Sequence, residues 1–246
     1  MKINIFLLCY NEAPLLPHTI NHYRKYLPSC KITIYDNEST DNSVEIAKSQ
    51  GCDVVSWSSG NIHNEHMLIF LRNTIWKNIL NGWIIIADMD EYICVTETEL
   101  LEEFNSGTSI LQIEGINMIG ESNNLDLTDI DLQQIQKYVE YSNESKNLCF
   151  LREKITEMNY GPGSHHCKPI GEIKYSLKKY INKHMSNLGL KYIINKMTRG
   201  YQRNEEMRKI GWNGHYTDNN EIVTKSYMNL LTNCKNLDDL HDLDDI

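Results

Sequence analysis

Three carboxylates follow a run of apolar residues in "WIIIADMDEYI", residues 83–93, as Asp88, Asp90 and Glu91. Clustered negative charge at the end of a buried strand is unfavourable unless a cation compensates it. In extended backbone, side chains at i and i+2 lie on the same side, so Asp88 and Asp90 can face one point. Magnesium is commonly held by one or two carboxylates together with substrate phosphate oxygens. The spacing therefore favours a divalent-cation site, and the alternative is an acidic turn that precedes a helix.

The elements that would position these carboxylates alternate through the first half of the chain. Strands are predicted for 3–9, 31–36, 52–57 and 83–87, and helices for 16–27, 41–51 and 63–82. Strands that are apolar on both faces and separated by helices are typical of a parallel sheet covered by helices. In such sheets ligands bind at the carboxyl ends of the strands. Three strands end in polar residues, in "CYNE", "YDNESTD" and "ADMDE", so we expect these segments to meet at one site.

The alternation fades after residue 95. A helix is predicted for 97–104, strands for 109–119 and 147–154, and a further helix for 187–211. The polar stretch 120–133 and the Gly/Pro-rich stretch 161–171 are predicted as loops. The sequence has no internal repeat and no linker that would divide it, so we expect residues 1–246 to form a single domain.

Composition and charge exclude several classes of protein. The chain of 246 residues has a formal net charge of −9, which argues against a nucleic-acid partner because phosphate binding needs a basic face. No apolar run approaches the ~20 residues that span a bilayer, and we interpret "MKINIFLLCYNE" as a first strand rather than a signal peptide. The 7 cysteines show no CxxC spacing, which favours reduced thiols in a cytosolic-type compartment. Zinc at "SHHC" (164–167) would lack a second ligand cluster.

Three motifs occur in order and at suitable spacing within residues 1–95: "FLLCYNEAPLLP", "ITIYDNESTDNSVEIA" and "LRNTIWKNILNGWIIIADMDEYI". Together they resemble the family 2-type glycosyltransferases. The resemblance implies the GT-A (nucleotide-diphospho-sugar transferase) fold, an α/β fold with a Rossmann-like, mostly parallel sheet flanked by helices. It divides the expected single domain into a nucleotide-sugar-binding half, 1–95, and an acceptor-side half with C-terminal helices, 96–246.

The second half resembles a branch of these enzymes found in bacteria and giant viruses. The residues that carry this resemblance are "GINMIG", "EMNYGPGSHHCKPIG", "KHMSNLGLKYIINKMTRG" and "GWNGHYT". Where the family usually has His-Tyr-Lys, this chain has His184, Met185 and Ser186. Together with the cysteine pattern, this leads us to expect an enzyme that acts in the cytoplasm, which for a virus-encoded member is the host cytoplasm.

The implied reaction is the transfer of a sugar, with inversion, from a UDP- or GDP-sugar to a hydroxyl of a carbohydrate or glycoconjugate acceptor. Mn²⁺ or Mg²⁺ would assist it. On the donor side, the resemblance assigns Asn11 and Glu12 to the nucleotide, Asp36 to the base, Arg72 to the diphosphate, and Asp88 to the ribose or the metal. On the metal side, it assigns Asp90 and a late histidine, with His184 preferred to His165 and His215.

The general base that deprotonates the acceptor is left open among Glu121, Glu157 and His165, because their spacing does not choose among them. Two other functions compete with the transferase. One is a non-catalytic nucleotide- or glycan-binding module on the same fold, which loss of the D-x-D motif or of Arg72 would have favoured. The other is a haloacid-dehalogenase-type phosphotransfer enzyme, in which the D-x-D motif belongs on the first strand rather than the fourth.

Overall fold

A mixed sheet runs through both halves of the chain in the computed structural model, which describes residues 1–211 and 215–239. The sheet has 10 strands within this described part. The strands are β1 (Ile3–Cys9), β2 (Lys31–Asp36), β3 (Asp53–Ser56), β4 (Trp83–Asp88), β5 (Glu91–Cys94), β6 (Ile110–Ile119), β7 (Lys137–Glu140), β8 (Cys149–Leu151), β11 (Tyr175–Asn187) and β12 (Lys235–Asn236). A separate small sheet pairs β9 (Ile155–Glu157) with β10 (Ile170–Gly171).

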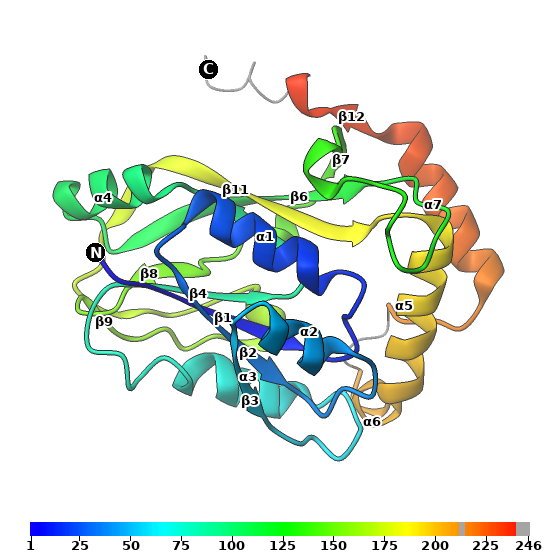
Figure 1. The fold of residues 1–246 in the computed structure, drawn as a ribbon, viewed down its shortest axis with the longest axis horizontal. Coiled ribbons are helices and arrows are strands. Elements are labelled where there is room, and N and C mark those ends of the chain that lie inside the picture. Colours follow the sequence, from blue (N-terminus) through cyan, green and yellow to red (C-terminus); the bar gives the residue numbers. More distant parts are fainter. Residues whose placement is uncertain (212–214, 240–246) are drawn as a thin grey trace.

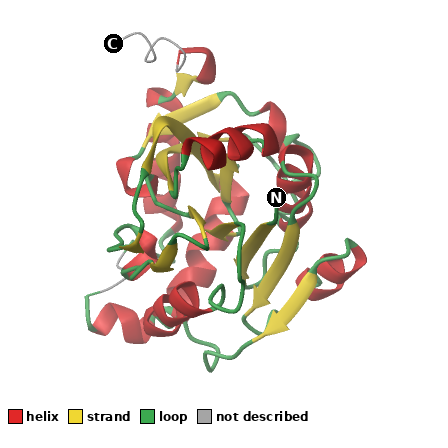
Figure 2. Cartoon of the chain, turned by 90° about the vertical axis from the view of Figure 1, so that its left-hand side faces the viewer, coloured by secondary structure: helices red, strands yellow, loops and turns green. Residues whose placement is uncertain are grey.

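Helices cover the sheet (Figures 1 and 2). They are α1 (Leu16–Tyr26), α2 (Ser43–Ser49), α3 (Glu65–Thr74), α4 (Glu97–Ser106), α5 (Leu190–Arg203), α6 (Glu205–Lys209) and α7 (Asn220–Asn233). Short 3-10 helices lie at η1 (Leu132–Gln134), η2 (Ser142–Glu144) and η3 (Pro162–Ser164). None of the helices in the described part of the chain has the length and apolar character that crossing a membrane requires.

The strand order places the ends of β1, β2 and β4 together. The main path of the sheet runs β12-β7-β6-β8-β4-β1-β2-β3, and β1 pairs in parallel with both β2 and β4. The strands of the second half join through β8, which is antiparallel to β4, and through β11, which is parallel to β6 and antiparallel to β5. The carboxyl ends predicted to meet are therefore adjacent, and strands from the second half continue the same sheet.

Apolar side chains on the two faces of the central strands form two cores. Along β4, Ile85 and Ala87 belong to the larger core, while Ile84 and Ile86 belong to a second core with Trp76. This alternation follows from the strand period of two, which sends successive side chains to opposite faces. It explains why residues 83–87 of the strand are all apolar.

Several predicted elements differ from the structure. The helix predicted for 63–82 ends at Thr74, and the buried Trp76 beyond it donates its indole N–H to the carbonyl of Arg72. The helix predicted for 187–211 divides at Asn204, whose side-chain amide donates to the Gly200 carbonyl. The prediction missed β5 and β11. Polar residues interrupt β11 along its length, and pairing with β5 and β6 on its two sides holds it extended.

Candidate functional site

The D-x-D motif forms the turn between β4 and β5. Asp88 is the last residue of β4 and Glu91 the first of β5. The Asp88 backbone N–H donates to Glu91 Oε2 at 2.7 Å. The Asp90 carbonyl accepts a hydrogen bond from the Met185 N–H at 2.7 Å. The backbone of the turn is therefore fixed by the third carboxylate of the motif and by β11.

Asp88 accepts two hydrogen bonds from the buried guanidinium of Arg72. Arg72 Nη2 lies 2.7 Å from Asp88 Oδ1 and 3.1 Å from Oδ2, and Arg72 Nη1 lies 3.4 Å from Glu65 Oε1. Burial alone would raise the pKa of Asp88, but the charge of Arg72 outweighs it and lowers that pKa. The structure thus places Arg72 between two carboxylates, where it orients Asp88, rather than free in the site.

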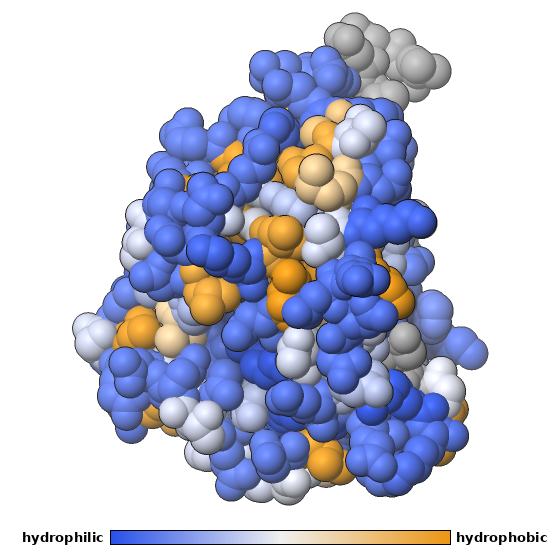
Figure 3. All heavy atoms as spheres, turned by 90° about the vertical axis from the view of Figure 1, so that its right-hand side faces the viewer, coloured by the Kyte–Doolittle hydropathy of each residue, from blue (hydrophilic) through white to orange (hydrophobic). Residues whose placement is uncertain are grey.

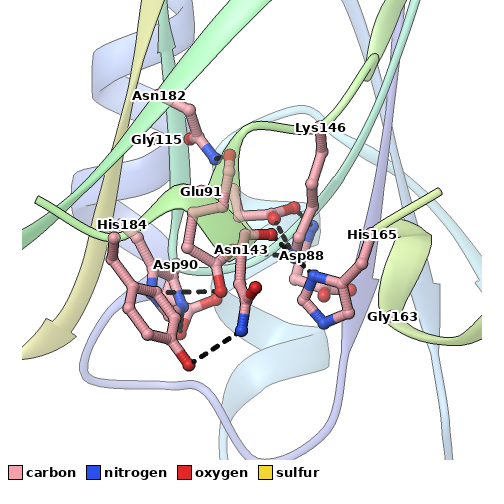
Figure 4. A network of polar contacts seen from close by, with 12 residues as sticks. Asp88, Asp90, Glu91, Gly115, Asn143, Lys146, Gly163, His165, Asn182 and His184 are labelled. Carbon is pink, nitrogen blue, oxygen red and sulfur yellow. Dashed lines mark hydrogen bonds and ion pairs between the residues drawn. The ribbon is translucent and has the colours of Figure 1, made fainter.

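A buried lysine pairs with the third carboxylate of the motif (Figure 4). Lys146 Nζ lies 2.7 Å from Glu91 Oε1 and 2.8 Å from Glu144 Oε2, and the three side chains are 5%, 2% and 6% exposed. Burial raises the pKa of Glu91 to about 7, despite the nearby ammonium. Burial would lower the pKa of Lys146, but Glu91 and Glu144 outweigh it and raise that pKa. The ammonium is therefore shared between two carboxylates that have almost no access to water.

The segment that carries Glu144 and Lys146 approaches the sheet where β6 has a glycine. A Cβ on Gly115 would lie 2.2 Å from the backbone carbon of Glu144. The Gly115 N–H donates to Ser145 Oγ at 3.0 Å. The absence of a side chain at this position is what allows the segment to reach Glu91.

His184 on β11 lies beside Asp90. Its Nε2 is 3.2 Å from Asp90 Oδ2, and its Nδ1 is 2.6 Å from Asn117 Oδ1 on β6. Because the amide oxygen accepts, Nδ1 carries the proton, and Nε2 faces Asp90. Burial would lower the pKa of His184, but the Asp90 carboxylate outweighs it and raises that pKa. Burial would likewise raise the pKa of Asp90, but Lys196 and His184 hold it well below its usual range.

The donors at Asp90 fit a divalent cation that is bound together with a phosphate. Asp90 and His184 Nε2 are adjacent, and the hydrogen bond from Nδ1 fixes the ring orientation, as outer partners of metal-binding histidines do. Across the described residues, no three His, Cys, Asp or Glu side chains form a complete metal-binding group. The other ligands would come from diphosphate and water, as is usual for Mg²⁺.

At the end of β2, Asp36 presents a buried acceptor. The residue is 3% exposed, and its Oδ2 accepts the Ser39 N–H at 3.0 Å. Its Oδ1 has no hydrogen-bond partner among the described residues. A buried carboxylate oxygen without a donor is costly, so this atom suits a ligand N–H.

The side chains of Asn11 and Glu12, at the end of β1, both form hydrogen bonds within the protein. Asn11 adopts a positive φ of 53°, and its Oδ1 accepts the Thr40 N–H at 2.7 Å. This side chain therefore holds the turn after β2. The Glu12 carboxylate accepts from Arg199 Nη2 at 2.5 Å. Burial raises the pKa of Glu12, against the opposing effect of Arg199.

The three candidates for the general base lie in different places. Glu157 pairs with Lys77 at 2.6 Å. Arg152 donates to the carbonyls of both Lys77 and Gly82, and Gly82 directly precedes β4. Glu157 therefore lies near the amino end of β4, away from the D-x-D turn. Glu121 lies beyond β6, where Lys137 pairs with it at 2.5 Å.

His165 lies in the polar network around Asp88 that Figure 4 shows. Its Nδ1 lies 2.6 Å from the carbonyl of Asn143, to which it donates. The neighbouring Gly163, with φ of 59°, donates its N–H to Glu65 Oε1 at 2.8 Å, and a Cβ there would lie 2.5 Å from His165 Nε2. Of the three candidates, His165 is the one that the structure brings close to the D-x-D turn. The other histidine considered, His215, is exposed and follows residues 212–214, which are not described.

Sequence reasoning did not find four charged residues at this edge: Glu144, Lys146, Lys196 and Arg199. Glu144 ends the three-residue 3-10 helix η2 and Lys146 follows it in irregular backbone, so neither residue belongs to a periodic pattern. The other two had a usable signal, because α5 carries basic residues at helical spacing and contains no Asp or Glu. A basic helix face predicted next to a sheet edge rich in carboxylates could have been expected to form ion pairs with those carboxylates.

Comparison with known proteins gives a match to the sequence profile described as glycosyl transferase family 2, over residues 4–93. Protein RfbJ of Shigella flexneri is 33% identical over 55 residues, which are 22% of this chain and 43% of RfbJ. This chain therefore spans less than half the length of the curated relative that it matches.

Solved structures resemble the chain more weakly. Staphylococcus aureus TarS 1–349 in complex with UDP-GlcNAc has a TM-score of 0.44 and 14% identity, covering 94% of this chain and 72% of TarS. Glucosyl-3-phosphoglycerate synthase of Mycobacterium tuberculosis, in complex with Mn²⁺, UDP and glucosyl-3-phosphoglycerate, has a TM-score of 0.32 and 16% identity, covering 46% and 44%. Similarities at this level carry no argument about the site.

The profile match covers β1 to β5 almost completely and ends within β5, three residues after Asp90. These strands, with α1 to α3, are the part of the sheet whose carboxyl edge carries Asp36, Asp88 and Asp90. Residues 4–93, which include these carboxylates, therefore match the family described as glycosyl transferase family 2.

Proposed function

We propose that this chain transfers a sugar, with inversion at the anomeric carbon, from a nucleoside-diphosphate sugar to a hydroxyl of a carbohydrate or glycoconjugate acceptor. The observation that carries the proposal is that one edge of the sheet holds an acceptor suited to a nucleobase and a pair of groups suited to a cation. The partnerless buried Oδ1 of Asp36 suits a nucleobase N–H. The pair formed by Asp90 and His184 suits a cation that binds the diphosphate. A donor lying along this edge would contact both.

The roles of the chain's own residues follow from their contacts. Asp36 would accept from the base, and Asp88, oriented by Arg72, would face the ribose or the cation. Asp90 and His184 would hold Mn²⁺ or Mg²⁺, which, when bound, would supply positive charge to the departing diphosphate. In this proposal residues 1–95 bind the donor and residues 96–246 supply the acceptor side of a single domain.

His165 is the proposed general base. With Nδ1 donating to the Asn143 carbonyl, its Nε2 has the lone pair that a base needs. The acceptor oxygen would form a bond to the anomeric carbon while the bond from that carbon to the diphosphate oxygen breaks. The hydroxyl proton would pass to Nε2, and the diphosphate would leave with the electron pair.

Binding of UDP and of GDP provides the first test, because the proposed donor is a UDP- or GDP-sugar. We expect calorimetry to show UDP or GDP binding that weakens when Mn²⁺ is chelated. Asp36→Ala should weaken binding by roughly 10-fold or more, because the base loses its acceptor. Asp53→Ala is the matched control, since that carboxylate is 60% exposed and pairs with Lys31 at 2.8 Å. A wild-type protein that binds neither nucleotide would contradict the proposed function.

His165→Gln should lower the turnover of a nucleotide sugar by roughly 100-fold, because it removes the base. The affinity for UDP should stay unchanged, since His165 is placed on the acceptor side. Initial rates and calorimetry on the same preparations measure both quantities. His166→Gln, one residue further along the same loop, is the control. Equal turnover in the His165 variant and the wild-type protein would return the role of base to Glu121 or Glu157.

A further inference from the structure

The helix α5 carries a row of positive charges across the candidate site. Lys196, Arg199 and Arg203 stand at i, i+3 and i+7, a spacing that places them on one helical face. Tyr192 and Ile193, one turn before Lys196 on the same side of the helix, are buried in the core. Figure 1 shows α5 standing next to the ends of the central strands. Figure 3 views the molecule from that side and shows a mainly hydrophilic surface with a strip of hydrophobic side chains.

The first two cations contact carboxylates of the site. Lys196 Nζ pairs with Asp90 Oδ2, the oxygen that also lies 3.2 Å from His184 Nε2. Arg199 Nη2 pairs with Glu12 Oε1 at 2.5 Å, and its Nη1 donates to the Asn11 carbonyl. Two cations of one helix are thus held by the ends of β4 and β1.

The third cation anchors the end of the helix. The Arg203 guanidinium carbon lies 3.3 Å from the centroid of the Tyr10 ring, and Nη2 donates to the Ile62 carbonyl at 3.2 Å. The His63 N–H donates to the Arg203 carbonyl at 2.8 Å. Arg203 therefore ties the end of α5 to the segment between β3 and α3 through contacts that do not involve Lys196 or Arg199.

A cation and a diphosphate that enter this site must displace these pairs. The side chains of Asp90 and Glu12 are only 13% and 16% exposed, because Lys196 and Arg199 cover them. A divalent cation on Asp90 would repel the Lys196 ammonium, which then needs another anion close by. The diphosphate of the donor supplies that anion at the same place, and phosphate oxygens accept well from both ammonium and guanidinium groups.

We propose that Lys196 and Arg199 bind the diphosphate of the donor, and that Lys196 moves to it from Asp90 when the divalent cation takes that carboxylate. The inference rests on the proposed function and adds two binding residues and an exchange of partners to it. In the structure, Lys196 pairs with the carboxylate that the cation would bind. The exchange therefore couples the binding of metal and of diphosphate.

Calorimetry with UDP and UMP in the presence of Mn²⁺ tests the binding of the diphosphate. Lys196→Met and Arg199→Met should each lower the affinity for UDP by roughly 10- to 100-fold, the range expected when one charge-assisted hydrogen bond is lost. The loss for UMP should be smaller, because UMP lacks the second phosphate. Lys191→Met is the control on the same helix, since Lys191 is exposed. Thermal unfolding of each variant checks that it folds.

Titration with Mn²⁺ alone tests the exchange. Lys196→Met should bind Mn²⁺ more tightly than the wild-type protein, because no ammonium competes for Asp90. Arg199→Met should bind Mn²⁺ as the wild-type protein does. Lys196→Met therefore changes affinity in opposite directions for metal and for UDP, which a general loss of structure would not do. Unchanged UDP affinity in both variants, while the wild-type protein binds UDP, would overturn the inference and leave the proposed function standing. Weaker Mn²⁺ binding by Lys196→Met would overturn the exchange.

Discussion

Asp90→Asn is expected to lower the turnover of a nucleotide sugar by roughly 100- to 1000-fold, the range seen when one group that stabilises developing charge is removed. The substitution keeps the size of the side chain and removes the charge that would hold the divalent cation. It also removes the anionic partner of Lys196 and His184. The release of UDP from a panel of UDP-sugars, followed over a range of Mn²⁺ concentrations, measures the effect.

The same assay needs a control for the loss of a carboxylate as such. Asp53→Asn provides it, because Asp53 lies at the start of β3, at the amino edge of the sheet. That variant should retain wild-type turnover. If Asp90→Asn turned over the same sugars at the wild-type rate at every Mn²⁺ concentration, Asp90 would have no part in binding the metal.

Lys146→Met is expected to lower the free energy of unfolding by about 3–5 kcal/mol, because it leaves two buried carboxylates without their cation. Glu91 and Glu144 are 2% and 6% exposed, so water cannot replace the ammonium at little cost. Denaturant unfolding at pH 7 measures the loss.

Lys77→Met is the matched control for Lys146→Met, because Lys77 pairs with Glu157 at a site where the two side chains are 38% and 37% exposed. A surface pair of this kind contributes at most about 1 kcal/mol. Equal losses in the two variants would show that the burial of the Lys146 cluster has no energetic consequence. Lys146→Met combined with Glu144→Gln should recover part of the loss, since one buried charge is then removed.

The part of the site made by parallel strands could be predicted from the sequence. The prediction of β2 was correct to the residue, and the ends of β1, β2 and β4 lie side by side because β1 pairs in parallel with both β2 and β4. Hydrophobic runs of strand length therefore sufficed to bring Asp36 and Asp88 to one edge.

The partners of these carboxylates could not be predicted in the same way. Lys146 lies in irregular backbone and reaches Glu91 across 55 positions of sequence. Its placement depends on the close approach at Gly115, which no local pattern reveals. The strand β11 was missed because "KKYINKHMSN" combines polar residues with few β-branched ones. Pairing on two sides, a property of the tertiary structure, overrides that local preference.

The double pairing of β11 limits how this protein can diverge during evolution. His184 lies opposite Glu91 of β5 on one side and opposite Asn117 of β6 on the other. Inserting or deleting one residue before it within the strand would turn its ring to the opposite face of the sheet. The contacts with Asp90 and Asn117 would then both be lost. Length variation among homologues should therefore collect in the loop between β6 and β7 and in the segment between β9 and β10, while the number of residues from β11 to α5 stays constant.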